Sequence, residues 1–226
     1  MKASRKRVKP AVPAQSAEAS QIPAATLPKD VYPESGFRLP LPRREDLDDE
    51  GKQMCDVILN PKTRTFLGLK GPLGLQLYSP PVAKLDLEMN EYLRFHAGFD
   101  ARVRELAILV TAREADSQFE WGIHEEVALK EGPDQKLIDA VKYRKSVRGL
   151  PETEAVVIQL GRQMLEKKKV APDIFARALK LFGARALVEL VSLMGHYWSK
   201  AALLAAFHAV DMHPGKRPLL PSLKRP

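Results

Sequence analysis

The sequence predicts an all-α fold, and three observations support this. No segment keeps up the period-two alternation of a half-buried strand, while apolar residues recur at helical spacing between prolines and glycines. Residues 102–132 read as two consecutive helices that turn back on each other. A long apolar stretch over 184–209 reads as a C-terminal helix. We therefore expect a multi-helix domain built around a central antiparallel helix pair.

The chain divides into three parts. Residues 1–42 contain seven prolines among alanine, serine and charged residues, which predicts a disordered or extended arm able to wrap a neighbouring subunit. Residues 43–210 hold the helical patterns, and a core of roughly 165 residues can bury about 70% of its unfolded surface. Residues 211–226 are rich in proline and basic residues and read as an extended tail.

Local signals mark the helices that precede the central pair. Asn60-Pro61 ends the first helix, which begins near residue 44. The glycine-rich stretch 61–80 predicts a loop with room for one short helical turn. A second helix follows to about residue 94, and Asp100 is a good N-cap for the central pair.

Similar signals mark the helices that follow. Gly132-Pro133 ends the central pair, Pro151 sits where a first-turn proline belongs, and Gly183 separates the last two helices. Besides the central pair, helices are expected over about 44–59, 81–94, 134–143, 151–168, 172–182 and 184–209.

The central stretch contains the residues that suggest chemistry. Its first half is apolar on nearly all sides, so we expect a buried helix, yet it contains Glu105. At helical spacing its neighbours Ala101, Ile108, Leu109 and Ala112 are apolar. Its carboxylate therefore has no obvious partner on its own helix, and its pKa should rise. In the second half, Ser117, Glu120 and His124 follow at i, i+3 and i+7 and share one face.

The net charge of +8 comes from the two ends of the chain. Residues 1–10 and 216–226 carry nine lysines and arginines and no acid. Removing these nine leaves 27 of the 36 basic residues against 28 acidic ones, so the domain itself has about one net negative charge. The domain is therefore not a basic nucleic-acid surface, and we expect neither a nucleic-acid nor a membrane partner; the basic ends are expected to be solvated.

Cys55 is the only cysteine, which excludes an intrachain disulfide and a CxxC redox pair and fits a reducing compartment. Residues 1–40 lack an apolar run long enough for a signal-peptide core, so we expect a cytoplasmic protein. The apolar stretch 186–210 contains Glu189, His196 and Lys200, so it reads as a buried helix and not as a membrane span.

The residues of the central pair resemble the signature of the carboxymuconolactone decarboxylase family, which includes the alkylhydroperoxidase-D-like proteins. The resemblance lies in Arg104-Glu105-Leu106, in the run SQFEWGIH from Ser117 to His124, and in Gly132. It covers about residues 80–150, and the final helix is similar to the closing helix of that fold. The resemblance implies an alkylhydroperoxidase-D-like helical fold and a homo-oligomer, trimeric or hexameric, with sites near subunit contacts.

The peroxidase branch of this family has cysteines at the positions of Ser117 and Glu120. A thiolate nucleophile and a resolving thiol are required for that peroxide chemistry, so we expect no such activity here. The decarboxylase branch keeps acid and histidine, as this sequence does. The resemblance thus implies a cofactor-free decarboxylase-like enzyme, with a small lactone or organic acid of the 4-carboxymuconolactone type as substrate.

The roles follow from the chemistry of decarboxylation, which passes through an enolate and needs a proton donor to carbon. We expect His124 to shuttle protons, Glu120 to orient it or share its proton, and Glu105 to act as a relay beneath. The further candidates for substrate binding are Ser117, Trp121 and His196. The same groups would equally serve a lactone isomerase or tautomerase.

Other interpretations remain open at this stage. Glu120 and His124 could form an ordinary i, i+4 surface pair, and Glu105 could be a core acid paired with Arg102 or Arg104 of another helix or subunit. Trp121 and His196 could simply be core residues. A metal site built from Glu105, Glu120 and His124 is conceivable, but no ligand motif supports it, and we expect none. The competing functions are an alkylhydroperoxidase-like antioxidant protein and a non-catalytic oligomeric scaffold.

Overall fold

The computed structural model describes residues 27–209 and 220–221, and this part of the chain is helical and contains no strand. The all-α prediction is confirmed for these residues. The helices are α1 Asp49–Leu59, α2 Pro72–Gln76, α3 Pro80–Phe95, α4 Ala101–Glu114, α5 Gln118–Glu131, α6 Gln135–Lys142, α7 Glu152–Leu165 and α8 Pro172–Ala206, with short 3-10 turns at Arg44–Asp46 and Gly68–Lys70.

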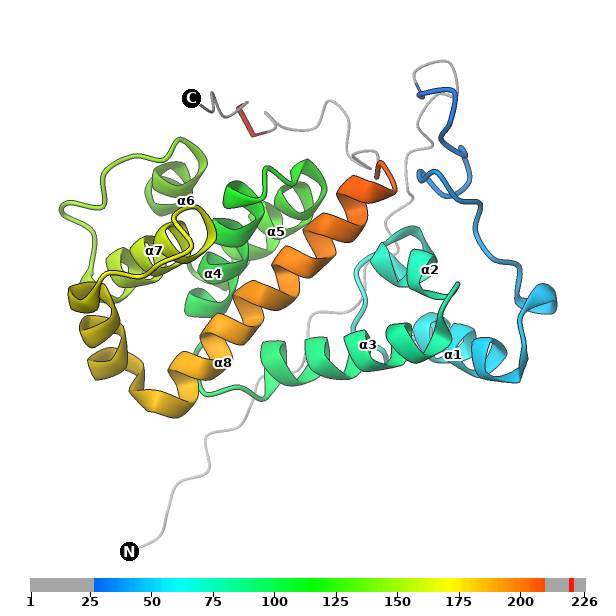
Figure 1. The fold of residues 1–226 in the computed structure, drawn as a ribbon, viewed down its shortest axis with the longest axis horizontal. Coiled ribbons are helices and arrows are strands. Elements are labelled where there is room, and N and C mark those ends of the chain that lie inside the picture. The colour runs from blue at the N-terminus through cyan, green and yellow to red at the C-terminus, as the bar shows by residue number, and fades with distance from the viewer. Residues whose placement is uncertain (1–26, 210–219, 222–226) are drawn as a thin grey trace, which may run out of the picture.

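Helix α4 lies at the centre of the fold and packs against α5, α6, α7 and α8 (Figure 1). Every residue from 103 to 114 is buried, as the apolar pattern predicted. Arg104 near the start of α4 lies 4.0 Å from Glu131 at the end of α5, so the two helices run antiparallel. On the other side, Gly161 of α7 lets that helix approach closely, because a Cβ there would lie 2.5 Å from Cγ1 of Val110.

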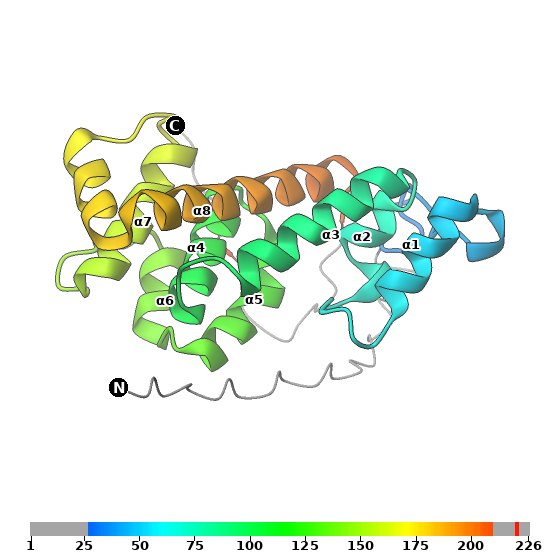
Figure 2. The same ribbon diagram turned by 90° about the horizontal axis from the view of Figure 1, so that it is seen from below.

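Helix α8 crosses the molecule beside α4 and continues along α3 (Figures 1 and 2). Gly183 interrupts it with φ 71° and ψ 169°, a conformation that glycine adopts without steric cost. The predicted division of the C-terminal region into two helices at Gly183 therefore corresponds to a sharp kink.

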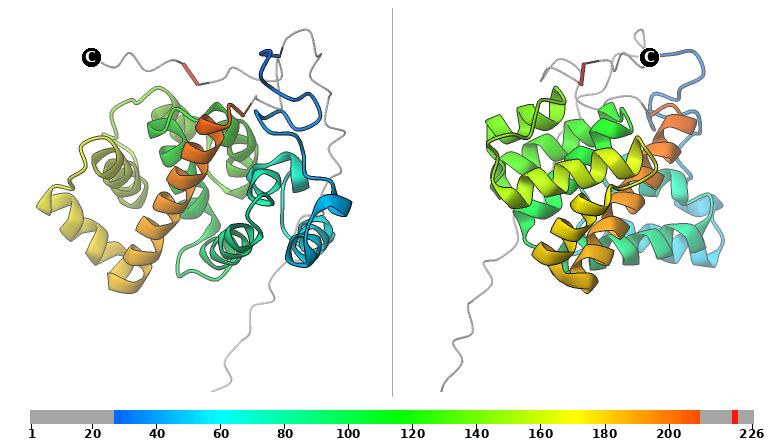
Figure 3. Two further views of the ribbon diagram at one scale, coloured as in Figure 1. Left: turned by 45° about the vertical axis from the view of Figure 1, so that its right-hand side comes forward. Right: turned by 60° about the vertical axis from the view of Figure 1, so that its left-hand side comes forward.

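Helices α1, α2 and α3 form a second layer beside α8 (Figure 3). Their own apolar cluster includes Met54, Cys55 and Ile58 of α1. The first helix begins at Asp49 and not near residue 44 as predicted, because Asp48 caps it by accepting a hydrogen bond from the Gly51 amide. Residues 61–80 contain the 3-10 turn and α2, slightly more helix than the one predicted turn.

The described ends of the chain pack against α5. Phe37 is buried and its ring centroid lies 6.4 Å from that of Phe119, so this part of the predicted N-terminal arm lies on its own chain. Leu220 is buried in the main core and exchanges two backbone hydrogen bonds with the side-chain amide of Gln118. The basic segments at 1–10 and 216–219, and the tail from 222, lie outside the described residues.

No helix in the described part of the chain is long and apolar enough to span a membrane.

Candidate functional site

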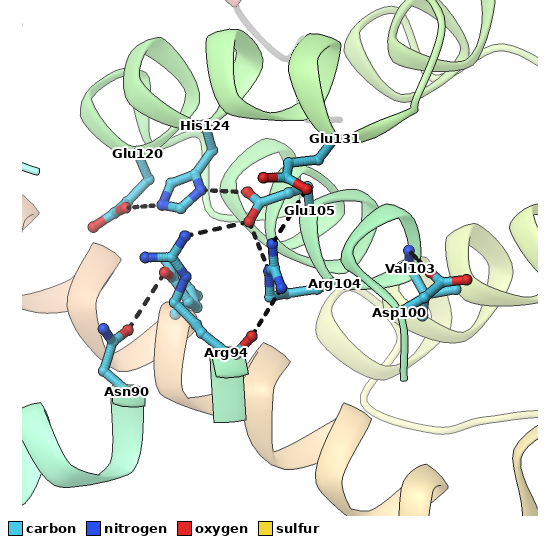
Figure 4. A network of polar contacts seen from close by, with 10 residues as sticks. Asn90, Arg94, Asp100, Val103, Arg104, Glu105, Glu120, His124 and Glu131 are labelled. Carbon is cyan, nitrogen blue, oxygen red and sulfur yellow. Dashed lines mark hydrogen bonds and ion pairs between the residues drawn. The ribbon is translucent and has the colours of Figure 1, made fainter. Parts of the chain in front are cut away.

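Glu105 lies at the centre of a buried network of charged side chains (Figure 4). Asp100 caps α4 by accepting the amide hydrogen of Val103, which places Glu105 in the second turn of that helix. Its side chain is fully buried. Oε1 accepts hydrogen bonds from Arg104 Nε at 2.9 Å and from Arg94 Nη2 at 3.3 Å.

The expectation of a raised pKa for Glu105 is wrong. Burial alone would raise this pKa, but His124, Arg94 and Arg104 outweigh burial and lower it from 4.5 to about 2. The carboxylate does have a partner on its own helix, since the side chain of Arg104 reaches back to it, and Arg94 comes from α3. Arg102, the other candidate partner, is instead paired with Glu154. Glu105 is therefore ionised at neutral pH.

His124 lies between the two carboxyl groups expected to act with it (Figure 4). Its Nδ1 lies 2.7 Å from Oε2 of Glu105, and its Nε2 lies 3.7 Å from Oε2 of Glu120. Because Glu105 is an acceptor, the neutral imidazole carries its proton on Nδ1 and has its lone pair on Nε2, towards Glu120. Glu105 thus lies on the Nδ1 side of the imidazole and Glu120 on its Nε2 side.

Glu120 is also buried, but its surroundings act in the opposite direction. Burial raises the pKa of Glu120, and its interactions with His124, Lys200 and Arg94 only partly oppose this. The backbone amide of Glu120 donates to Ser117 Oγ, which caps α5. The site therefore contains one carboxyl group held ionised and one biased towards its protonated form, on opposite sides of one imidazole.

Aromatic rings and arginines enclose the imidazole. Phe66 and Tyr197 contact His124 edge-on, with ring centroids 5.4 Å and 5.0 Å from it. The guanidinium of Arg94 stacks over the rings of Phe66 and Phe95 at 4.6 Å and 5.0 Å. Such stacking stabilises a buried cation without hydrogen-bonding it, and Nη2 of Arg94 donates its hydrogen bond to Glu105.

A cavity of about 70 Å³ lies against this group. His124 and Glu120 line it from α5, Arg94 and Asn90 from α3, and Lys200 from α8; the loop at 64–68, the start of α2 at 71–73, Ile123 and Tyr197 complete the lining. Its volume admits a few water molecules or a very small ligand. A larger substrate would require the loop to move.

The three residues predicted to bind substrate do not line this cavity. Ser117 caps α5, and Trp121 is buried in the main core with no hydrogen-bond partner for its Nε1. His196 faces Asp86, with Nε2 3.8 Å from Oδ1, and burial together with the charge of Lys200 lowers its pKa to about 4. Of the six predicted site residues, the structure brings together Glu105, Glu120 and His124.

Three further residues, Arg94, Phe66 and Lys200, line the cavity, and none of them was predicted as a site residue. A signal for Lys200 was present, because a lysine within a long apolar helix calls for a partner just as Glu105 does. Phe66 and Arg94 gave no such signal, since the first lies in a loop and the second ends an amphipathic helix.

Neither a thiol nor a cluster of metal ligands is found at this site in the described residues. Cys55 lies in the separate cluster formed by α1 to α3, and burial raises the pKa of its thiol. No group of three histidine, cysteine or acidic side chains in the described chain has a geometry suited to a metal ion. No known protein-family model matches the sequence, and no curated protein matches it either.

Proposed function

We propose that this protein is a cofactor-free acid–base enzyme of the carboxymuconolactone decarboxylase type, which acts on a small lactone or organic acid. One observation carries the proposal: buried His124 lies between a carboxylate with a lowered pKa and a carboxyl group with a raised pKa, beside a small cavity. Two carboxyl groups whose pKa values are pushed apart by their surroundings are typical of an acid and base pair. The family resemblance of residues 104–132 supports the same reading.

The arrangement suits decarboxylation of an acid that has a second carbonyl group, placed so that it can accept the electron pair of the broken carbon–carbon bond. When the carbon–carbon bond to the carboxylate breaks, CO₂ leaves and the electrons move onto the carbonyl as an enolate. The protonated Glu120 can donate a hydrogen bond to this oxygen. Its proton can then pass to Nε2 of His124, which delivers it to carbon, and a proton from water restores Glu120 for the next turnover. Glu105 keeps the ring oriented and stabilises its charge. A lactone isomerase would form the enolate when a base removes a proton from carbon, and the same groups would return that proton to a different carbon.

The proposal is tested by screening 4-carboxymuconolactone and related lactone acids for CO₂ release by the purified protein. With the substrate found, His124→Ala or Glu120→Gln should lower kcat/KM at least about a hundredfold, a range typical of a lost acid or base. His96→Ala is the matched control, because that imidazole is exposed on the surface. Unchanged turnover in both site variants, with folding intact, would remove the mechanism.

We also propose that the chain forms a homo-oligomer, a trimer or hexamer, through the outer faces of α3 and α8. These adjacent helices expose residues without charge: Val82, Leu85, Met89 and Tyr92 on α3, and Val188, Ser192, Gly195, Ser199 and Ala202 on α8. An exposed apolar surface of this kind is typical of a protein contact.

Light scattering tests the assembly. The wild type should have a multiple of the 25.2 kDa chain mass, and Leu85→Glu with Val188→Glu should reduce it to one chain. Leu59→Glu, at an exposed leucine on α1, should leave the mass unchanged. A wild-type mass of one chain would refute the oligomer and leave the catalytic proposal standing.

A further inference from the structure

A second cluster of charged side chains adjoins the cavity where α3 meets α8. Lys200 lines the cavity, and its Nζ donates a hydrogen bond to Oδ2 of Asp86 at 2.6 Å. Both side chains are largely buried. His196, one turn before Lys200, lies on the other oxygen of Asp86, and its Nε2 has no hydrogen-bond partner. The acid–base steps proposed for His124 do not use this cluster.

The cations of this region face the cavity, and their carboxylates lie behind them. Arg64, Arg94 and Lys200 belong to the lining. Their partners Glu91, Glu105 and Asp86 do not. Among the described residues that line the cavity, Glu120 is the one acid, and burial favours its uncharged form. A ligand in the cavity therefore meets positive groups first, which favours an anion.

Lys200 is better suited than Arg94 to bind such an anion. An ammonium group has three N–H donors, and the hydrogen bond to Asp86 uses one of them. Arg94 donates a hydrogen bond to Glu105 and stacks on an aromatic ring, so its guanidinium already belongs to the network around Glu105 (Figure 4). The pKa of His196 is lowered to about 4, so its imidazole is neutral at pH 7. It therefore does not compete with the Lys200 ammonium for the charge of the Asp86 carboxylate.

We propose that Lys200 binds the carboxylate of an anionic substrate and that Asp86 positions its ammonium group for this contact. The inference rests on the proposed function, since it names the substrate class of the same cavity: a small organic acid that is bound by its carboxylate. Holding the anion at Lys200 places the rest of a small molecule against His124 and Glu120 on α5.

The test uses propionate, and propionamide as its uncharged equivalent, with binding followed by ligand-observed NMR on the full chain. The wild type should bind propionate and not propionamide. Lys200→Met should weaken propionate binding at least tenfold, and Lys200→Arg should restore it to within about threefold, because a cation suffices. Lys180→Met is the matched control, since that lysine is exposed on the same helix and should have no effect.

Two further variants separate binding from folding. Lys200→Met leaves Asp86 buried without its cation, so the double variant Asp86→Asn, Lys200→Met removes both charges together and should fold but not bind propionate. Asp86→Asn alone should keep the fold and weaken propionate several-fold without creating propionamide binding, as expected of a positioning residue. Equal propionate affinity in the wild type and the double variant would overturn the proposal, as would a wild type that binds no propionate.

This experiment can fail independently of the catalytic proposal. His124→Ala should retain propionate binding while it loses turnover, and that result supports both ideas. Binding that depends on Lys200 together with unchanged turnover in His124→Ala would leave the anion site standing and remove the catalytic role of the histidine.

Discussion

Glu105→Gln is the sharpest test of the network beneath the imidazole. The carboxylate accepts hydrogen bonds from two arginines and from His124, and these contacts lower its pKa from 4.5 to about 2. At about 1.4 kcal/mol for each pH unit, this difference corresponds to about 3 kcal/mol of stability at neutral pH. The loss of one member of a buried ion pair typically costs a similar amount, about 3–5 kcal/mol.

The pH dependence of this cost has a definite sign. The pKa of Glu105 is lower in the folded chain than in the unfolded chain, so its stabilisation is present above about pH 4.5 and is lost as the pH falls towards 2. Urea unfolding should therefore show a deficit of about 3 kcal/mol for Glu105→Gln at pH 7 and less than about half of that at pH 3. Glu152→Gln is the matched control, because its ion pair with Arg177 is exposed and its urea midpoint should stay unchanged.

Two results would refute this reasoning. A deficit below about 1 kcal/mol at pH 7 would mean that the carboxylate gains little from its three partners. A deficit as large at pH 3 as at pH 7 would mean that its ionisation is not what stabilises the fold.

Three further substitutions test other parts of the structure. Phe66→Ala removes the ring that covers the imidazole, so water should enter and kcat should fall by roughly tenfold or more in steady-state assays. Gly161→Ala adds a methyl group 2.5 Å from Val110 Cγ1, and this overpacking should lower the free energy of unfolding by about 1–3 kcal/mol in urea. Gln118→Ala removes both hydrogen bonds to Leu220, and thermal unfolding should show a loss of about 1–2 kcal/mol.

Each of these has a contrary outcome. A Phe66→Ala enzyme with unchanged kcat would show that the ring has no part in excluding water. Lys180→Ala is the control for Gly161→Ala, because that lysine is exposed on a helix and its truncation to alanine should be neutral or slightly stabilising. Equal stability of both alanine variants would contradict the close approach of α7 to α4. A melting temperature unaffected by Gln118→Ala would show that Leu220 is held by its apolar contacts alone.

The helices could largely be predicted from the sequence because their signals are local. Asp100, Ser117 and Asp134 each cap a helix by accepting a backbone amide, and Gly183 breaks the C-terminal helix where expected. The first α-helix begins later than expected, because residues 44–46 form a separate 3-10 turn before Asp48 caps the α-helix. Sequence patterns indicate that a helix is present more reliably than they locate its first and last residues.

The partners of Glu105 could not be found in the same way. Sequence spacing on one helix names the residues three and four positions away. For Glu105 these include one charged residue, Arg102, and it pairs with Glu154 instead. The actual partners of Glu105 are Arg104, the adjacent residue whose long side chain reaches back, and Arg94 and His124 from other helices. The direction of its pKa depended on those tertiary contacts, so burial alone gave the wrong sign.

In the candidate site too, positions on one helix could be predicted and contacts between helices could not. The sequence placed Glu120 and His124 on one face of one helix, and this is where they lie. Which loop covers them, and which cation from α8 faces them, depends on how α3 and α8 pack. That packing leaves no regular trace in the spacing of residues.

The anchoring of both described ends of the chain on the first turn of α5 has a practical consequence. Phe37 packs against Phe119 and Leu220 bonds to Gln118, so the helix that carries Glu120 and His124 is braced by residues distant in sequence. Trimming of either end by contaminating proteases would keep every side chain of the candidate site and still loosen the helix that carries two of them. A preparation that loses activity on storage should accordingly be checked first by intact-mass spectrometry.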